Sequence, residues 1–221
     1  MTDCTPFVRD LGLADYVPVC EAMRLFTQTR TPKTPDEIWF VEHPCVYTAG
    51  RDAHTTAAVI NGIPLIQVER GGDITLHAPG QMVVYPLLDL RRRKLMIKPY
   101  VSILLTTLID TLADFGLCAS THPGAPGVYV PMDGGTGEFK GKAKIASIGI
   151  HVSRGCTFHG IALNVDTDLA GFRRIAPCGY RGLRVTDMAS LGIHTDLQTV
   201  KLRYRFRLLE ALQTAFEKQT K

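Results

Sequence analysis

The sequence predicts an α/β protein of the α+β type, with a mixed, largely antiparallel sheet flanked by helices. Two observations predict this class. Short apolar runs outnumber amphipathic segments, and several successive runs are joined by connections too short to hold a crossover helix. A chain of 221 residues, 45% hydrophobic and 21% charged, is long enough for one sizeable core. We therefore expect a single domain over residues 1–221.

Three segments have the apolar spacing of amphipathic helices. The first runs from about Asp15 to Arg30, with Pro18 tolerated in its first turn. The second spans Lys98 to Phe115 and stops at a glycine, and the third spans Thr199 to Lys218.

Short apolar runs between these segments predict strands. They are Ile38–Val41, Ile63–Val68, Met82–Leu88, Val128–Val130, Ile145–Val152 and Phe158–Asn164. The glycine-rich stretch Asp133–Glu138 joins two of them and reads as an exposed hairpin tip or a lid.

The stretch Arg70–Gln81 holds three glycines, a proline and several polar side chains between two apolar runs. Its composition predicts a loop that is fixed at both ends by buried strands. Glycines let the backbone approach a ligand closely, which favours a binding site. An ordinary glycine turn beside a histidine is the alternative interpretation.

Neither a membrane span nor a signal peptide is apparent. No stretch approaches the roughly 20 apolar residues that a span needs, and the first ten residues lack a basic-then-apolar pattern. We expect a cytoplasmic protein with no membrane partner.

The six cysteines are widely spread, and none falls in a Cys-x-x-Cys pair. This spacing argues against a zinc finger and against a disulfide framework, so we expect reduced thiols. His77, His151 and His159 together with Cys178 match no zinc pattern either. We expect no metal and no cofactor.

The formal net charge is only +4, but the basic residues are clustered. One cluster is Arg91–Lys94, another surrounds Cys178, and a third lies on the last helix. Such clusters either steer an acidic partner toward a site or form a solvated surface. No pattern of stacking aromatic residues suggests nucleic acid.

Two residues stand out as candidates for chemistry. Cys178 lies between a proline and a glycine, in a turn that would expose its sulfur, and nearby arginines would favour the reactive thiolate. Its proton could pass to His77, His151, His159 or Lys144. Lys144 begins an almost wholly apolar run, where desolvation favours a neutral amine able to shuttle protons. The alternatives are a buried structural cysteine and a lysine whose amine reaches solvent.

Six groups of residues occur in a fixed order along the chain. They are Glu42–Gly50, Arg70–Gln81 with the following Tyr85-Pro86, Gly127–Val130, Lys144–Gly149, His159–Asn164 and Pro177–Gly179. Together they resemble the lipoyl(octanoyl) transferase family. The resemblance implies the fold of the biotin and lipoate ligase catalytic domain.

The resemblance also implies an activity. The enzyme would move an octanoyl group from octanoyl-acyl carrier protein to a lysine ε-amine on lipoyl domains of 2-oxoacid dehydrogenases and on the glycine cleavage H protein. Cys178 would be the acyl-thioester nucleophile and Lys144 its acid/base partner. The implied substrate-binding residues are Arg70, Gly71, Gly72, Asp73, Ile74, Thr75, Leu76, His77, Ser147, Ile148, Gly149, Gly160, Ile161 and Ala162.

Two expectations concern how such a site would work. Strand residues such as Ile145, Ile161 and Tyr85 are candidates to line a pocket for the acyl chain. Backbone amides near Cys178 and in the Gly71-Gly72 segment are candidates to stabilise an oxyanion.

Three other functions remain open from the sequence. One is an ATP-dependent lipoate or biotin ligase on the same fold, which needs no nucleophilic cysteine. Another is a thiol hydrolase that releases the fatty acid to water. The third is a non-catalytic module that binds acyl groups or carrier proteins.

Overall fold

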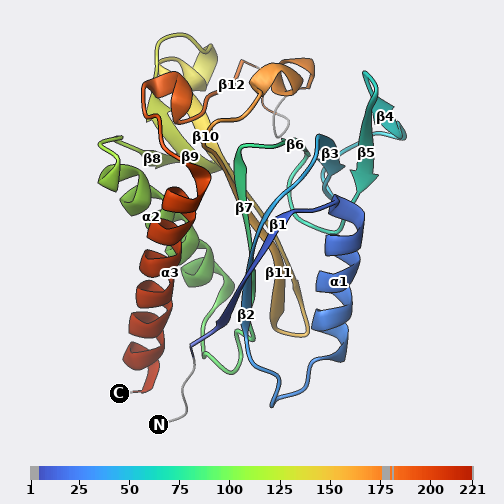
Figure 1. Cartoon of the computed structure of the whole chain (residues 1–221), viewed down its shortest axis with the longest axis vertical. Helices are drawn as coiled ribbons and strands as arrows, with labels where there is room; N and C mark the ends of the chain where they lie inside the picture. The colour runs from blue at the N-terminus through green and yellow to red at the C-terminus, as the bar shows by residue number, and fades with distance from the viewer. Residues whose placement is uncertain (1–4, 176–179, 181, 221) are drawn as a thin grey trace.

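The computed structural model describes residues 5–175, 180 and 182–220, and of residues 219 and 220 only the backbone (Figure 1). Three helices pack on a central sheet: α1 (Tyr16–Thr29), α2 (Ile97–Asp114) and α3 (Leu197–Thr220). Figure 1 shows α2 and α3 on one face of the sheet and α1 on the other, with both termini at the same end of the molecule. Among the described residues, no helix combines the length and apolarity that crossing a bilayer requires.

The central sheet contains eight strands. In sheet order, seven of them are β1 (Phe7–Leu13), β2 (Glu37–Glu42), β7 (Gln81–Leu87), β11 (Cys156–Asn164), β10 (Lys142–Ser153), β9 (Ala125–Pro131) and β8 (Ser120–His122). The eighth strand, β12 (Arg184–Val185), pairs in parallel with β10. Among the described residues of this sheet, only the β1–β2 and β10–β12 pairs are parallel, so the predicted mixed, largely antiparallel sheet is confirmed.

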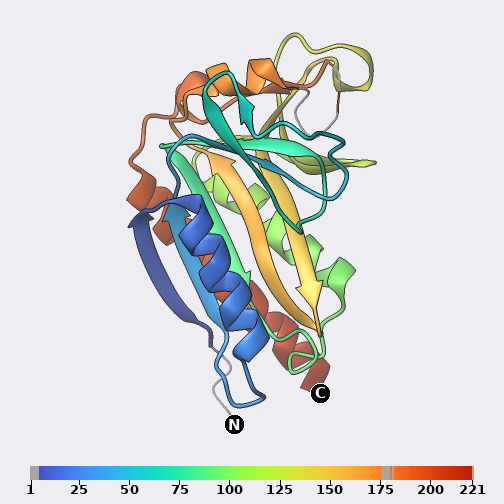
Figure 2. The ribbon, with the colours of Figure 1, turned by 90° about the vertical axis from the view of Figure 1, so that its right-hand side faces the viewer.

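A smaller sheet covers one end of the molecule. Its strands, in order, are β4 (Val59–Ile60), β5 (Ile63–Gln67), β3 (Val46–Ala49) and β6 (Ile74–His77). Figure 2 shows it lying across the upper ends of β10 and β11. Three short 3₁₀ helices complete the described elements: η1 (Gly137–Phe139), η2 (Leu169–Arg174) and η4 (Ala189–Leu191).

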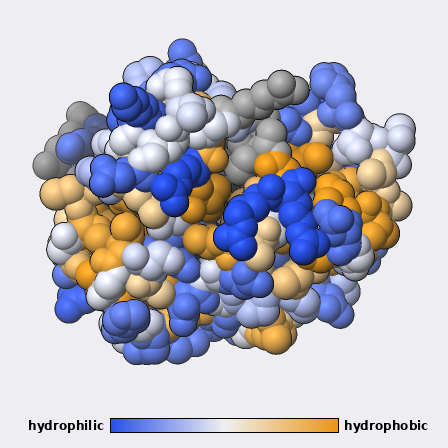
Figure 3. Space-filling view, turned by 90° about the horizontal axis from the view of Figure 1, so that it is seen from above, coloured by the Kyte–Doolittle hydropathy of each residue, from blue (hydrophilic) through white to orange (hydrophobic). Residues whose placement is uncertain are grey.

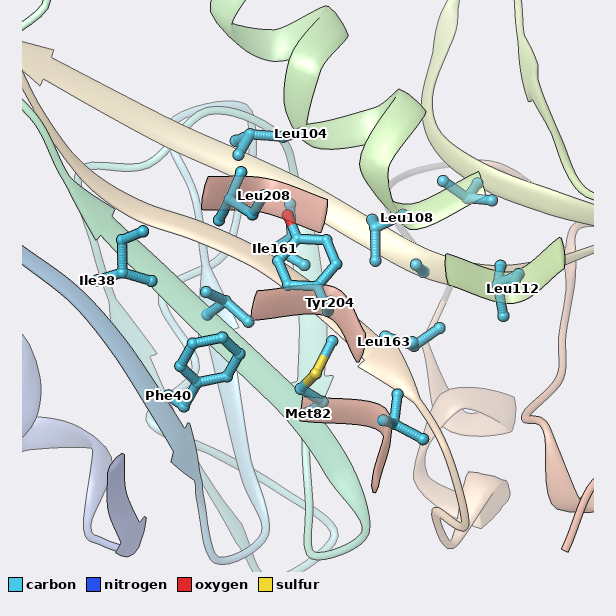
Figure 4. Packing of buried hydrophobic residues seen from close by; sticks show 14 of the residues in the cluster. Ile38, Phe40, Met82, Leu104, Leu108, Leu112, Ile161, Leu163, Tyr204 and Leu208 are labelled. Atoms are coloured by element: carbon cyan, nitrogen blue, oxygen red, sulfur yellow. The ribbon is translucent and has the colours of Figure 1, made fainter. Parts of the chain in front are cut away.

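Two apolar layers fill the space on either side of the central sheet. The larger joins the sheet to α2 and α3, where Phe40 packs edge-on against Tyr204 at 6.4 Å between ring centroids (Figure 4). The other layer joins α1 to the opposite face through Met23 and Trp39. Burial of these side chains is the main force that holds helices and sheet together.

The three predicted helices and the six predicted strands are all present, with ends shifted by a few residues. The strands that sequence periodicity missed are short or lie at an edge. β1 is an edge strand with no fully buried residue, so it has no continuous apolar run.

The prediction that the whole of Arg70–Gln81 is a loop was wrong. Ile74–His77 forms β6, which pairs with β3 and buries Thr75, Leu76 and His77. Two of these buried side chains are polar, so the segment does not look like a strand in sequence.

Asp133–Glu138 does join two antiparallel strands, β9 and β10, as expected. The connection is partly anchored, because η1 buries Phe139 beside Tyr129 and Tyr180. That the Asp133–Glu138 connection acts as a lid over a ligand stays a prediction.

A buried ionic cluster lies where β2 begins. The carboxylate of Asp36 accepts hydrogen bonds of 2.6 Å from each of Arg30, Arg92 and Arg93. Burial raises the pKa of Asp36, but the charge of Arg93, the Asp89 amide and the other two arginines outweigh it and leave the pKa below its usual value. The cluster closes the turn between α1 and β2.

Candidate functional site

A cavity of about 600 Å³ opens between the two sheets, within the usual size range of small-molecule sites. Its walls come from β6 and the segment before it, from β7, β10 and β11, and from the N-terminal turns of α1 and α2. Seen from above, this end of the molecule carries exposed hydrophobic residues among hydrophilic ones (Figure 3).

The structure brings almost all predicted substrate-binding residues together in this wall. Those that line it are Arg70, Gly71, Gly72, Asp73, Thr75, His77, Ser147, Ile148, Gly149, Gly160, Ile161 and Ala162. Ile74 and Leu76 do not line the cavity, because alternate residues of β6 point into the small apolar cluster around Tyr47.

The cavity lies along an open edge of β10. Pairing between β9 and β10 ends at Ala146 opposite Val128, and Ser147 and the residues after it line the cavity. The N–H of Gly71 donates to the Ile150 carbonyl at 3.1 Å, which ties the glycine segment to this edge. Backbone groups of a strand edge can bind an extended ligand.

Arg70 holds the glycine segment in place. Its guanidinium donates to the Thr48 carbonyl at 2.6 Å and to the Thr48 hydroxyl at 2.8 Å, and it is only 7% exposed. Gly50 and Gly149 leave room for it, since a Cβ would lie 2.7 Å from Nη1 at Gly50 and 2.9 Å from Cδ at Gly149. The two glycines therefore permit a close approach of loop and strands.

The expectation that the Gly71 and Gly72 amides stabilise an oxyanion is not supported. The Gly71 N–H is bonded to Ile150, and the Gly72 N–H donates to the Asp52 carboxylate at 3.0 Å. Both donors already have acceptors.

His77 reaches the cavity from the end of β6 in a fixed tautomer. The Asn164 amide donates to the Thr186 carbonyl at 3.0 Å, so its oxygen is the atom that accepts from Gln81 at 2.9 Å. The Gln81 amide nitrogen also donates to the Leu76 carbonyl, so its oxygen faces His77 Nδ1 at 2.7 Å. The network therefore assigns the proton of His77 to Nδ1 and leaves Nε2 as an acceptor.

Buried rings surround His77. Tyr16 stacks on it at 5.6 Å between centroids, and His43 packs edge-on at 5.7 Å while bonding the Tyr85 hydroxyl at 2.9 Å. Burial, reinforced by the nearby His43, lowers the pKa of His77 to about 3. The imidazole is therefore neutral at neutral pH.

His159 and His151 differ in position. His159 lines the cavity and is 1% exposed, and burial lowers its pKa to about 3. His151 lies outside the cavity wall and its Nδ1 is bonded to the Glu69 carbonyl at 2.9 Å. Of the three predicted histidine candidates, two reach the cavity.

Lys144 enters the sheet as its sequence surroundings predicted, and is 2% exposed. Its Nζ lies 5.7 Å from the centre of the Tyr129 ring, a cation–π distance. Gly127 makes room for it, since a Cβ there would come within 2.5 Å of Lys144 Cε. Lys144 itself does not line the cavity, which begins three residues further along β10.

Cys178 lies outside the described residues. Two positions further along the chain, Tyr180 lines the cavity and donates to the Gly124 carbonyl at 2.6 Å. Its ring packs edge-on against Phe139, which stacks on Tyr129, the ring beside Lys144. An aromatic row therefore connects the surroundings of Lys144 to this segment.

The predicted pocket lining was partly correct. Ile161 and Tyr85 line the cavity, but Ile145 is fully buried in the core against α2 and α3. Sequence reasoning missed the cavity residues Tyr16, Ile97 and Val101. Tyr16 and Val101 follow the ordinary spacing of core-facing helical residues, and Ile97, which is 48% exposed, precedes the predicted helix.

Comparisons with known proteins agree with this geometry. The family model of the lipoyl protein ligase A/B catalytic domain matches residues 20–205. The chain is 52% identical over 208 residues to an octanoyltransferase of Polynucleobacter necessarius, covering 93% of this chain and 95% of the relative. It is 49% identical to an octanoyltransferase of Pseudomonas entomophila, covering 94% and 93%.

Solved structures with low sequence identity share the fold. A bi-partite lipoate protein ligase from Thermoplasma acidophilum superposes with a TM-score of 0.71 at 16% identity, over 94% of this chain and 84% of that chain. Biotin protein ligase from Aquifex aeolicus gives 0.52 at 12% identity, over 96% and 71%. The predicted fold is confirmed, and the chain belongs to the lipoyl protein ligase A/B catalytic domain family and, within it, to the octanoyltransferases, which are acyltransferase enzymes.

Proposed function

We propose that this enzyme transfers an octanoyl group from octanoyl-acyl carrier protein to a lysine of a lipoyl domain, through a thioester on Cys178 and with Lys144 as acid/base. The observation that carries the proposal is the cavity itself. One wall contains the three predicted substrate-binding segments, and Tyr180, two residues from Cys178, lines it as well.

The first step is thioester exchange. The Cys178 thiolate attacks the octanoyl carbonyl, the bond from carbon to the donor sulfur breaks, and the carrier thiolate takes a proton. One thioester replaces another, so the step is nearly balanced in energy and depends mainly on positioning and charge stabilisation. Lys144, whose side chain is 2% exposed, supplies that proton to the leaving sulfur.

The second step forms an amide. The neutral ε-amine of the lipoyl-domain lysine attacks the Cys178 thioester, the carbon–sulfur bond breaks, and the amine loses a proton as the amide forms. Lys144, having given up its proton in the first step, accepts this one. The proposal relies on Tyr180, which lines the cavity and follows Cys178 by two positions in the chain.

The acyl chain fits an apolar part of the cavity. Ile148, Ile150, Ile161 and Val101 lie in the wall. Burying the seven hydrocarbon groups of an octanoyl chain, at about 0.8 kcal/mol each, contributes on the order of 5 kcal/mol of binding. Discrimination of about 1 to 3 kcal/mol for one methylene makes the preference for chain length real but not absolute.

The partners follow from this reaction. Acyl carrier proteins are acidic as a class, and the exposed side chain of Arg51 is among the residues that line the cavity. Lipoyl domains of 2-oxoacid dehydrogenases and the glycine cleavage H protein would be the acceptors.

The test is intact mass after mixing the protein with octanoyl-acyl carrier protein in the absence of ATP. We expect one octanoyl adduct on the wild type, removed by hydroxylamine or by a lipoyl domain and absent from Cys178→Ser. Lys144→Ala should form and discharge the adduct much more slowly, and Cys45→Ser, at an exposed thiol, is the control. Acceptor modification that requires ATP and survives in Cys178→Ser would instead indicate an adenylate-forming ligase. Steady release of octanoate without acceptor would indicate a hydrolase.

A further inference from the structure

A second group of reactive side chains lies beside the cavity, and the octanoyl-transfer chemistry does not use it. It consists of Cys20 on α1, Glu69 on the segment after β5, and His159 on β11. The thiol sulfur, one carboxylate oxygen and one ring nitrogen all lie within 4.8 Å of one another. Helix α1 packs on β11, which brings the three segments together (Figure 1).

Several polar atoms of this group have no hydrogen-bond partner among the described residues. They are both ring nitrogens of His159 and Oε2 of Glu69. Arg24 donates to the other oxygen, Oε1, at 2.8 Å and leaves Oε2 unused, 3.9 Å from His159 Nε2. A buried polar atom without a partner is unfavourable, and native structures rarely keep one without a reason.

The backbone at His159 is unusual too. Its φ is +58°, in the left-handed region, although it lies within a paired stretch of β11. Strain of this kind persists only where the surroundings impose it, and it occurs most often at functional sites.

The Arg24 guanidinium is the charged neighbour of this group. Its Nε donates to Glu69 Oε1 at 2.8 Å, and its Nη2 lies 4.0 Å from Cys20 Sγ. It therefore holds the carboxylate in place and leaves Oε2 to face His159 Nε2. A metal that binds here would displace the proton of the Cys20 thiol.

We propose that Cys20, Glu69 and His159 form a binding site for a divalent cation of the zinc class. Sulfur, imidazole nitrogen and carboxylate oxygen are the donors that zinc prefers, and three protein ligands leave a fourth position for water. Binding forms bonds from the metal to Sγ, Nε2 and Oε2, and releases the Cys20 proton to solvent. The sequence gives no sign of this site, because its ligands are far apart in the chain and match no zinc motif.

The same bound metal would couple two parts of the molecule. His159 lines the acyl cavity, and Cys20 belongs to the helix whose first turn supplies Tyr16 to the cavity wall. Occupation of the site would restrain that wall.

The test is metal binding by the full-length, metal-free protein. We expect one Zn²⁺ per chain in competition with a chromophoric chelator, a rise of the thermal midpoint with free Zn²⁺, and a thiolate-to-cobalt charge-transfer band when Co²⁺ replaces zinc. Cys20→Ser should remove the band and weaken zinc binding at least tenfold, and Glu69→Gln should weaken it without removing the band. Cys156→Ser, at a thiol that is 4% exposed like Cys20, is the matched control and should bind as the wild type does.

A parallel titration of Cys178→Ser separates this site from the proposed nucleophile. Unchanged binding in Cys178→Ser with loss in Cys20→Ser supports the proposal, whether or not the octanoyl adduct forms. Loss in Cys178→Ser with retention in Cys20→Ser, or no stoichiometric binding to the wild type, would overturn it.

Discussion

Both ends of the central sheet bury ionisable side chains, but they do so in opposite ways. Around Asp36 the acid is surrounded by three arginines, so buried charges of opposite sign offset one another. Around the cavity, His77 is bonded to the neutral Gln81, and His159 lies 3.9 Å from the Glu69 carboxylate without a hydrogen bond to it. Burial keeps both imidazoles neutral. The first arrangement fixes the chain, while the second leaves titratable groups facing a space where a ligand can bind.

The two ends differ in whether a buried polar group is offset by a partner of opposite charge. A charge that is paired and fully hydrogen-bonded has no capacity left for a substrate. A neutral imidazole held in one tautomer keeps a lone pair directed away from its partner, as His77 does through Gln81. Binding chemistry therefore gathers at the end where burial is not matched by opposite charge.

The largest expected effect comes from removing the charge of Asp36, which pairs with three arginines. Asp36→Asn leaves Arg30 and Arg93 buried without their counter-charge, and removal of one partner of a buried pair costs about 3 to 5 kcal/mol. We expect the free energy of unfolding in urea to fall by that amount. Replacing the partly exposed Arg92 by alanine should cost about 1 kcal/mol or less, and equal losses in the two variants would contradict the contrast.

At the cavity end, the side chain of Lys144 is positioned by the room that Gly127 leaves for it. In Gly127→Ala the new Cβ would clash with Lys144 Cε and with the Ala146 carbonyl, at 2.5 and 2.6 Å, on a backbone with φ of +141°. We expect octanoyl transfer to slow at least tenfold, about 1.4 kcal/mol or more in the barrier.

Gly116→Ala is the control for that variant. Gly116 has a positive φ of +79° just after α2, but a Cβ there meets nothing within 4 Å. It should lose stability through backbone strain yet keep the transfer rate, measured as single-turnover acylation of a lipoyl domain. Equal slowing in both variants would mean that strain, not displacement of Lys144, is responsible.

The sequence predicted the parts of the fold that follow from continuous burial. The helix Lys98–Phe115 and the strand Phe158–Asn164 carry long apolar patterns, and both are present. β6 was missed because its buried positions include Thr75 and His77, whose burial depends on Gln81 and on neighbouring strands. Polar side chains satisfied by tertiary partners leave no trace in local periodicity.

The sequence predicted which segments line the cavity better than it predicted how those segments are arranged around it. The resemblance selected the segments that line the cavity, including Ser147–Gly149 and Gly160–Ala162. It did not show that β9 leaves β10 after Ala146, which creates the open edge. Nor did it place Tyr16 in the wall, since that requires knowing how α1 crosses the sheet.

The tautomer of His77 provides the next test. Gln81→Leu removes the acceptor that fixes the Nδ1 proton and leaves the Asn164 oxygen without its donor. We expect a loss of about 1 to 3 kcal/mol in unfolding free energy. Nitrogen chemical shifts of His77 should change from a pure Nδ1–H form to a mixture, whereas in the wild type they should report one tautomer.

The most gradual effect concerns pH, and it follows from the buried neutral state of His77. Its pKa falls from about 6.5 to about 3 on folding, so between these values the unfolded chain binds a proton that the folded one does not. The free energy of unfolding must therefore fall as pH falls through this window, by about 1.4 kcal/mol per pH unit for each such group.

The test is to measure the free energy of unfolding in urea at several pH values between 5.5 and 4. In His77→Gln it should change with pH less steeply than in the wild type, by about 1.4 kcal/mol per pH unit, because the variant takes up about one proton fewer on unfolding. His194→Gln, at an exposed imidazole, is the matched control. An unchanged slope in His77→Gln would mean that the cavity admits a charged imidazole, and the contrast between the two ends of the sheet would then lie in pairing geometry alone.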